Sequence, residues 1–264
     1  MARFTGKSVL VSGGASGIGE ATVRTFVADG ANVVIADVNG DLGEKLQRSL
    51  GDSTVFVPLD VSDSSAWQGA VNTVVDSFGG LHVLVNCAGI QLCGVIDEVS
   101  DEDWNRVIGV NLSGTFFGCR TAFPAIRASG GGAIVNISSS GVLQGYQQYP
   151  AYSASKAGVM ALTQSIAAYC RNSGFAIRCN AVLPGGIETP MVHDALRRDF
   201  GLDPGSEVAT PMLAALGRPS QIADVVAYLA SNEASYVNGQ SILVDGASTL
   251  TVPAASMTQA VAVE

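Results

Sequence analysis

Lysine and histidine are scarce in this 264-residue chain, and positive charge as a whole is limited. Three lysines and eleven arginines stand against 23 acidic residues, which gives a formal net charge of −9 at pH 7. Because nucleic acids and anionic membranes are bound by basic patches, we expect no nucleic-acid partner and no membrane partner. The two histidines, His82 and His193, have no cysteine or histidine cluster beside them, so no metal site is expected.

Long apolar runs and paired cysteines are also missing from the sequence. No stretch of 18 apolar residues occurs, and the opening residues MARFTGKSVLVSGG contain no hydrophobic segment of signal-peptide length. The five cysteines are odd in number and form no CxxC pair, a usage typical of reduced thiols. We therefore expect a cytoplasmic location.

What the sequence does contain is a regular alternation of strand-like and helix-like segments. Apolar runs of strand type lie at 8–12, 32–37, 54–60, 81–86, 132–138, 175–180 and 241–245. Segments with helical periodicity lie between them, at 17–30, 41–51, 64–78, 101–128, 152–172 and 219–231. This alternation predicts an α/β fold with a single domain, 1–264, built on a doubly wound parallel sheet of about seven strands. Residues 190–217 interrupt the alternation as a substrate-binding insertion with short helices, and 247–264 form a tail.

The turn after the first strand, SGGASGIG at 12–19, is rich in glycine. The strict G-x-G-x-x-G pattern is absent, but Gly13, Gly17 and Gly19 lie between a strand and a helix. Glycines there permit a close backbone approach, and the helix N-terminus offers N–H groups to a pyrophosphate. Asp37 ends the second strand, 18 residues after Gly19. An acidic residue at about this interval binds adenosine ribose hydroxyls; a turn or N-cap aspartate is the alternative.

A tyrosine and a lysine lie four positions apart in YSASK, at 152–156. Because residues i and i+4 share one face of a helix, Tyr152 and Lys156 are expected to point the same way. A free phenol has a pKa of about 10, and a nearby ammonium favours the phenolate. The pair therefore suits a general acid/base, and the alternative is a surface helix on which two side chains happen to be neighbours.

Together these motifs resemble those of the short-chain dehydrogenase/reductase family in order and spacing. The further motifs that carry the resemblance are NCAG at 86–89, VNLSG at 110–114, NISSSG at 136–141, LPGGIETP at 183–190 and VNGQSILVDGA at 237–247. The resemblance covers 6–247 and departs at two positions. Ser12 stands where the family more often has threonine, and Cys87 stands where NNAG is usual.

The resemblance implies a Rossmann-type fold, a homotetramer, and an NAD-dependent alcohol dehydrogenase or ketoreductase. The implied catalytic residues are Asn111, Ser139, Tyr152 and Lys156. In this set Ser139 hydrogen-bonds the substrate oxygen, and Asn111 holds a water in a proton relay to Lys156. Tyr152 exchanges the hydroxyl proton while the cofactor exchanges a hydride with the carbinol carbon.

The resemblance also implies a set of cofactor-binding residues. They are Gly13, Ser16, Gly17, Ile18, Gly19, Asp37, Asp60, Val61, Asn86, Ala88, Gly89, Tyr152, Lys156, Pro184, Gly185, Ile187 and Thr189. Within this set, Asp60 and Val61 hold the adenine, Lys156 holds the nicotinamide ribose, and Ile187 and Thr189 contact the carboxamide.

The substrate pocket is expected to form from 91–95, 140–149, Gly185, Gly186 and 190–217. These stretches offer apolar side chains such as Leu92, Val142, Leu143, Tyr146, Met191 and Met212. Arg197 and Arg198 are their only cations, and both are expected to face solvent. The pocket therefore predicts a neutral hydrophobic secondary alcohol or ketone, of alicyclic, terpenoid or steroid-like type.

Two other functions remain open on the same fold. The first is a 3-oxoacyl-carrier-protein reductase, which Asp37 opposes because such enzymes commonly prefer NADPH. Gly130 and Ser173 also stand where basic residues for an acidic carrier would be expected. The second is a non-catalytic NAD-binding regulator, which the intact catalytic set opposes.

Overall fold

Seven parallel strands form one sheet in the order β3-β2-β1-β4-β5-β6-β7. The computed structural model describes residues 2–250. Its strands are β1 (Ser8–Ser12), β2 (Asn32–Asp37), β3 (Thr54–Pro58), β4 (Val83–Asn86), β5 (Gly132–Ile137), β6 (Ile177–Pro184) and β7 (Ser241–Val244). The strand order reverses between β1 and β4, so the predicted doubly wound sheet is confirmed.

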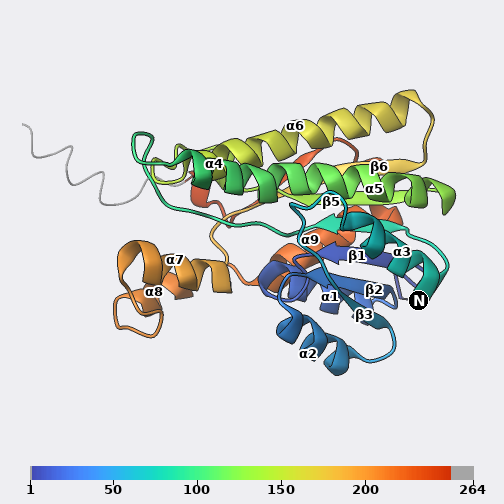
Figure 1. The fold of residues 1–264 in the computed structure, drawn as a ribbon, viewed down its shortest axis with the longest axis horizontal. Helices are drawn as coiled ribbons and strands as arrows, with labels where there is room; N and C mark the ends of the chain where they lie inside the picture. Colours follow the sequence, from blue (N-terminus) through green and yellow to red (C-terminus); the bar gives the residue numbers. More distant parts are fainter. Residues whose placement is uncertain (1, 251–264) are drawn as a thin grey trace, which may run out of the picture.

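Helices cover both faces of this sheet (Figure 1). They are α1 (Gly17–Ala28), α2 (Gly40–Leu50), α3 (Trp67–Phe78), α4 (Asp101–Ile108), α5 (Gly114–Ala128), α6 (Pro150–Asn172), α7 (Pro190–Phe200), α8 (Ala209–Ala214) and α9 (Pro219–Ala230). The helices α7 and α8 fall in the predicted insertion and lie off one end of the sheet (Figure 1). No helix within residues 2–250 is both long enough and apolar enough to cross a bilayer.

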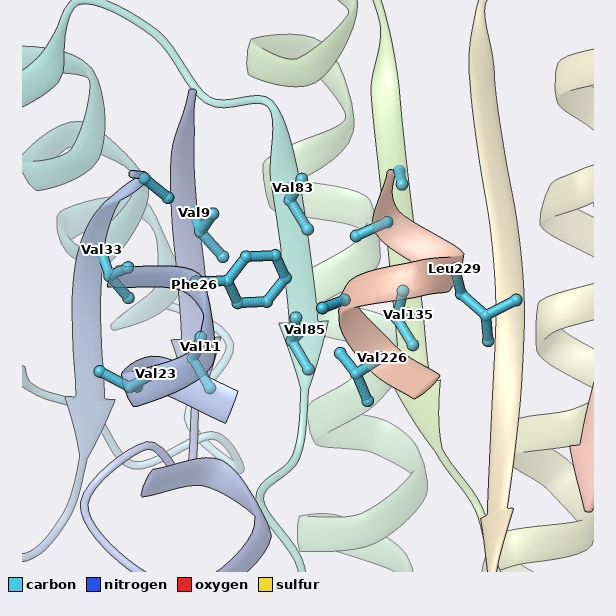
Figure 2. Packing of buried hydrophobic residues seen from close by; sticks show 14 of the residues in the cluster. Val9, Val11, Val23, Phe26, Val33, Val83, Val85, Val135, Val226 and Leu229 are labelled. Atoms are coloured by element: carbon cyan, nitrogen blue, oxygen red, sulfur yellow. The ribbon is translucent and has the colours of Figure 1, made fainter. Parts of the chain in front are cut away.

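Two hydrophobic cores lie on opposite faces of the sheet because successive strand residues point to opposite sides. On one face, Val9 and Val11 pack with Phe26 of α1 and Val226 of α9 (Figure 2). On the other face, Leu10 packs in a cluster that includes residues of α3 and α5. The strands are therefore apolar on both sides, which is why the sequence shows them as continuous apolar runs.

The predicted bounds differ most from the structure in two elements, and several others differ by one to three residues at an end. The expected helix 101–128 is divided into α4 and α5 by a π-helical turn at Gly109–Ser113. The strand expected at 175–180 runs on to Pro184. The strand continues past Asn180 because its backbone pairs with β5 at Ala181 and Val182 and with β7 from Ala181 to Pro184. Of the predicted tail, residues 251–264 lie outside the described part of the chain.

Candidate active site

A cavity of about 640 Å³ opens beyond the carboxyl ends of the central strands. This is the edge at which open α/β sheets bind ligands, next to the reversal of strand order. Most of the predicted site residues line it: Gly13, Ser16, Gly17, Ile18, Asp37, Asp60, Val61, Ala88, Gly89, Ser139, Tyr152, Lys156, Pro184, Gly185, Ile187 and Thr189. Residues that lie far apart in the sequence are therefore brought around one space.

The glycine turn is shaped so that no side chain fills the floor of the cavity. Gly13 has φ +65, and a Cβ there would lie 2.6 Å from the Cα of Ala88. Gly19 lies behind the turn, against the backbone of Gly13, and not in the cavity wall. Within residues 2–250, the side chain of the N-cap Ser16 bonds none of the first-turn N–H groups of α1. Those N–H groups suit a phosphate, so the cradle fits a dinucleotide.

Asp37 joins the glycine turn to the start of α2. Its Oδ2 accepts from the Ala15 N–H at 3.0 Å, and its Oδ1 accepts from the Asn39 N–H at 2.9 Å. The carboxylate thus serves the turn, as the alternative interpretation supposed, and also lines the cavity. Asp60, at the same end, accepts at Oδ1 from the N–H of Ser62 at 2.9 Å and from its hydroxyl at 2.7 Å.

Tyr152 and Lys156 lie on the face of α6 that borders the cavity, as the i, i+4 spacing predicted. The Lys156 Nζ is 5.7 Å from the centroid of the Tyr152 ring. It donates to the Ile137 carbonyl at 2.8 Å, at the end of β5. Lys156 is buried, so this bond gives the ammonium one polar partner away from water.

Burial shifts the pKa values of both side chains. It raises the pKa of Tyr152, and the hydrogen bond with Ser139 opposes that change. Burial lowers the pKa of Lys156 to about 8, and the electrostatic interaction with Cys87 acts in the opposite direction. Loss of solvent around the phenol is the largest of the effects on Tyr152, and it acts against the phenolate that a nearby ammonium was expected to favour.

Ser139 is the one of the three consecutive serines that bonds to Tyr152. Its Oγ also accepts from the Gly141 N–H at 3.1 Å, at the start of a short 3₁₀ turn. Ser138 instead donates its hydroxyl to the Lys156 carbonyl at 2.8 Å and so fastens β5 to α6. The geometry thus agrees with the choice of Ser139, which rested on resemblance and register.

Asn111 lies behind the cavity wall, fully buried in the π-helical turn. Its Oδ1 accepts from the Ile90 N–H at 2.8 Å, and its Nδ2 donates to the Ile90 carbonyl and to the Ser155 hydroxyl, both at 3.0 Å. A Cβ on Gly89 would lie 3.3 Å from both Asn111 Oδ1 and Lys156 Nζ. Asn111 therefore ties the loop after β4 to α6 without lining the cavity itself.

Asn86, predicted to line the cofactor, is buried beneath that loop and is not part of the cavity wall. Its Nδ2 donates to Asn136 Oδ1 at 2.8 Å, joining β4 to β5. Gly118 of α5 leaves the space for this pair, since a Cβ there would lie 2.5 Å from Asn86 Oδ1. Asn86 thus supports the loop from below.

The sequence analysis missed several wall residues, of which Arg106, Val110 and Cys87 are the most informative. Arg106 and Val110 border the cavity from α4 and the π-helical turn, near Val61. Their i, i+4 spacing just before Asn111 is the signal that could have revealed them. Burial raises the pKa of Cys87 to about 12, so its thiol is uncharged at neutral pH.

Comparison with known proteins agrees with this geometry. A family model described as enoyl-(acyl carrier protein) reductase matches residues 13–249. A 3-alpha-(or 20-beta)-hydroxysteroid dehydrogenase of Mycobacterium tuberculosis is 41% identical over 92% of this chain and 90% of its own length. The chain belongs to the short-chain dehydrogenase/reductase family. A trans-4-hydroxycyclohexanecarboxylate dehydrogenase of Sinomonas cyclohexanicum is 38% identical over 94% of each chain. The crystal structure of gox2181 superposes with a TM-score of 0.85 at 32% identity, over 95% of this chain and 98% of that one.

Family membership decides the enzyme class. The protein is an alcohol dehydrogenase/ketoreductase that interconverts a secondary alcohol and a ketone with a nicotinamide cofactor. This activity removes the non-catalytic regulator from consideration. The cavity brings together a dinucleotide cradle, the half-buried Tyr152 and the buried Lys156, as that chemistry requires.

Proposed function

We propose that this short-chain dehydrogenase/reductase uses NAD to oxidise a neutral, hydrophobic secondary alcohol with an alicyclic, terpenoid or steroid-like body, or to reduce the matching ketone. The observation that carries the proposal is one cavity with Asp37 at its adenosine end and Ser139, Tyr152 and Lys156 at its other end. Two relatives, one named for a hydroxysteroid and one named for trans-4-hydroxycyclohexanecarboxylate, support a cyclic substrate.

The preference for NAD rests on Asp37. The glycine cradle would take the pyrophosphate, and Asp37 would take the adenosine ribose hydroxyls. A 2′-phosphate beside this carboxylate would be repelled by up to about 4 kcal/mol at ~4 Å with an effective dielectric of ~20. Once bound, the cofactor supplies the nicotinamide ring that exchanges a hydride. The same repulsion argues against an NADPH-preferring 3-oxoacyl-carrier-protein reductase.

Side chains of the protein would exchange the proton with the substrate and orient the substrate oxygen. The Tyr152 hydroxyl is the proposed general acid/base, and Ser139, hydrogen-bonded to it, is the proposed group that orients the substrate oxygen. Lys156 is the proposed partner of the nicotinamide ribose. Its pKa of about 8 lets it gain or lose a proton near neutral pH, which suits a proton relay through a water that Asn111 would hold.

The substrate end of the cavity supports an uncharged ligand. Its wall includes Tyr146, Gly186, Met191 and Val192. Arg197 and Arg198 point away from it and pair with Asp194 at 3.3 Å and Asp199 at 2.6 Å. The cations that line the described cavity are Arg106 and Lys156, and Lys156 is the proposed partner of the nicotinamide ribose. The insertion supplies no cation to this wall, so a carboxylate or phosphate held there would lose its hydration with little compensating charge.

An NAD-coupled screen tests both parts of the proposal. It compares neutral cyclic alcohols, hydroxysteroids, hydroxy acids including 4-hydroxycyclohexanecarboxylate, and phosphorylated sugars, each with NAD and with NADP. We expect the neutral cyclic alcohols to give the highest kcat/KM, and NAD to be preferred at least about tenfold. Equal kcat/KM with both cofactors overturns the Asp37 assignment, and a clear lead for charged substrates overturns the substrate class.

We also propose that the enzyme is a cytoplasmic homotetramer. Only 14% of its residues are charged. Large apolar side chains such as Trp104 and Phe116 are exposed on α4 and α5. Such a surface is typical of a face that packs against another copy of the same chain.

A further inference from the structure

A buried carboxylate outside the catalytic set joins the insertion to the catalytic helix. The Tyr149 hydroxyl donates to Asp199 Oδ2 at 3.1 Å. The Asp199 side chain is only 3% exposed, although it lies at the end of a surface helix. Nothing in the proposed chemistry uses either residue, and neither lines the cavity. A carboxylate is rarely buried without a specific role.

The helix that carries Asp199 is otherwise weakly attached to the rest of the enzyme. Leu196 of α7 packs with Ala209 and Leu213 of α8 in a small cluster of its own, separate from both cores of the sheet. Among the side-chain hydrogen bonds within residues 2–250, the bond to Tyr149 is the one that links α7 to a segment outside 186–217. At its other end, α7 places Met191 and Val192 in the cavity wall.

Tyr149 lies where the substrate-side segments meet. It is the N-cap residue of α6, three positions before Tyr152. Its neighbour Gln148 accepts at its carbonyl from the Gly94 N–H at 2.9 Å, so the loop after β4 reaches the same point. A bond from Asp199 to this residue therefore fixes α7 relative to the start of the catalytic helix.

The charges around the bond keep it formed across the neutral range. The Arg198 guanidinium donates from Nε to Asp199 Oδ1 at 2.6 Å and from Nη2 to Asp199 Oδ2 at 2.9 Å. This pair holds the pKa of Asp199 below its usual value. Burial and the hydrogen bond to this carboxylate raise the pKa of Tyr149, so the phenol remains a donor. The remaining titratable neighbour is Cys93, whose pKa is raised by burial.

We propose that Asp199 is a positioning residue that, through Tyr149, holds α7 closed over the substrate end of the cavity. The inference rests on the proposed function in one respect, that the substrate binds beneath α7. Loss of the bond then weakens substrate binding and leaves the chemical step and the cofactor end unchanged. KM for the alcohol should rise while kcat and KM for NAD stay constant.

The kinetic test uses Tyr149→Phe, which removes one oxygen and keeps the ring and the Arg198–Asp199 pair. We expect KM for the best alcohol of the screen to rise about tenfold, with kcat and KM for NAD within about twofold. In Asp199→Ala, KM for the alcohol should rise by the same factor. In Asp199→Asn, which keeps an acceptor oxygen, KM should rise less. The double variant Tyr149→Phe/Asp199→Asn should be no worse than Tyr149→Phe alone. The matched control is Asp194→Asn, which breaks an exposed pair on the same helix and should change nothing.

A second readout does not depend on the identity of the substrate. In Tyr149→Phe, amide hydrogen exchange should become faster across α7 and stay unchanged across the body of α6. If the screen selects a charged substrate, the proposed substrate class fails, while faster α7 exchange still supports the Tyr149–Asp199 role. Unchanged α7 exchange overturns that role, as does a fall in kcat at constant KM, whatever the substrate.

Discussion

At the scale of single residues, Tyr152 gives the most direct test of the catalytic assignment. Replacing it with phenylalanine removes the oxygen that would exchange the proton and keeps the ring that packs beside Lys156. We expect kcat of Tyr152→Phe to fall by about 10²- to 10⁴-fold, with NAD affinity within about twofold, measured by fluorescence titration. Substantial residual turnover would show that another group carries the proton.

Lys156 gives a residue-scale prediction on stability and pH. Its pKa is lowered from 10.5 to about 8 by burial, so between these values the unfolded chain binds more protons than the folded protein. Stability without cofactor should therefore rise with pH across this window, by at most about 3 kcal/mol from this group. Urea unfolding at pH 7, 8, 9 and 10 measures the free energy of unfolding of the wild type and of Lys156→Met. The free energy of the wild type minus that of the variant should increase from pH 8 upward. A difference that does not change with pH would contradict the lowered pKa of Lys156.

At the scale of secondary structure, the glycine turn between β1 and α1 can be tested by two matched substitutions. Gly6 and Gly13 both have positive φ, +75 and +65, so alanine strains the backbone at either site by about 1 kcal/mol. Only at Gly13 would the new Cβ meet another segment, the backbone of Ala88. Gly13→Ala should therefore weaken NAD binding at least about tenfold, whereas Gly6→Ala should not. Calorimetric titration with NAD measures the affinity of each variant. Equal affinities of Gly13→Ala and Gly6→Ala would show that the glycine turn is not part of the cofactor site.

The strands were the most predictable elements, because a strand buried on both faces is a continuous apolar run. The bounds of β1 and β2 agree with the sequence prediction. The π-helical turn was not predictable, because it depends on a tertiary contact, the pair of bonds from Asn111 to the backbone of Ile90. One helix over 101–128 was expected there, and the structure divides it at Gly109–Ser113.

At the scale of the whole molecule, the cofactor end was more predictable than the substrate end. Each strand end is fixed by its own apolar run, and the parallel sheet brings these ends to one edge. The substrate wall instead depends on how 190–217 pack. Leu143 and Met212, expected as apolar pocket surface, are 56% and 50% exposed and lie outside the cavity wall. Arg106 of α4, which was not predicted, also lines the cavity.

Assembly gives the last prediction, also at the scale of the whole molecule. Phe116 of α5 is 41% exposed, and the Arg120 guanidinium lies 5.2 Å from its ring centroid, so α5 presents an aromatic–cation surface to solvent. An uncovered patch of this kind destabilises a soluble monomer, and a second copy would bury it.

Size-exclusion chromatography with light scattering should give four times the chain mass of 27.0 kDa. Phe116→Glu should shift the enzyme to smaller species, because each copy would lose an apolar ring at the interface and would bury a carboxylate there. The control is Val75→Glu on α3, which is exposed on a different helix and should leave the mass unchanged. A wild-type monomer at micromolar concentration would refute the tetramer.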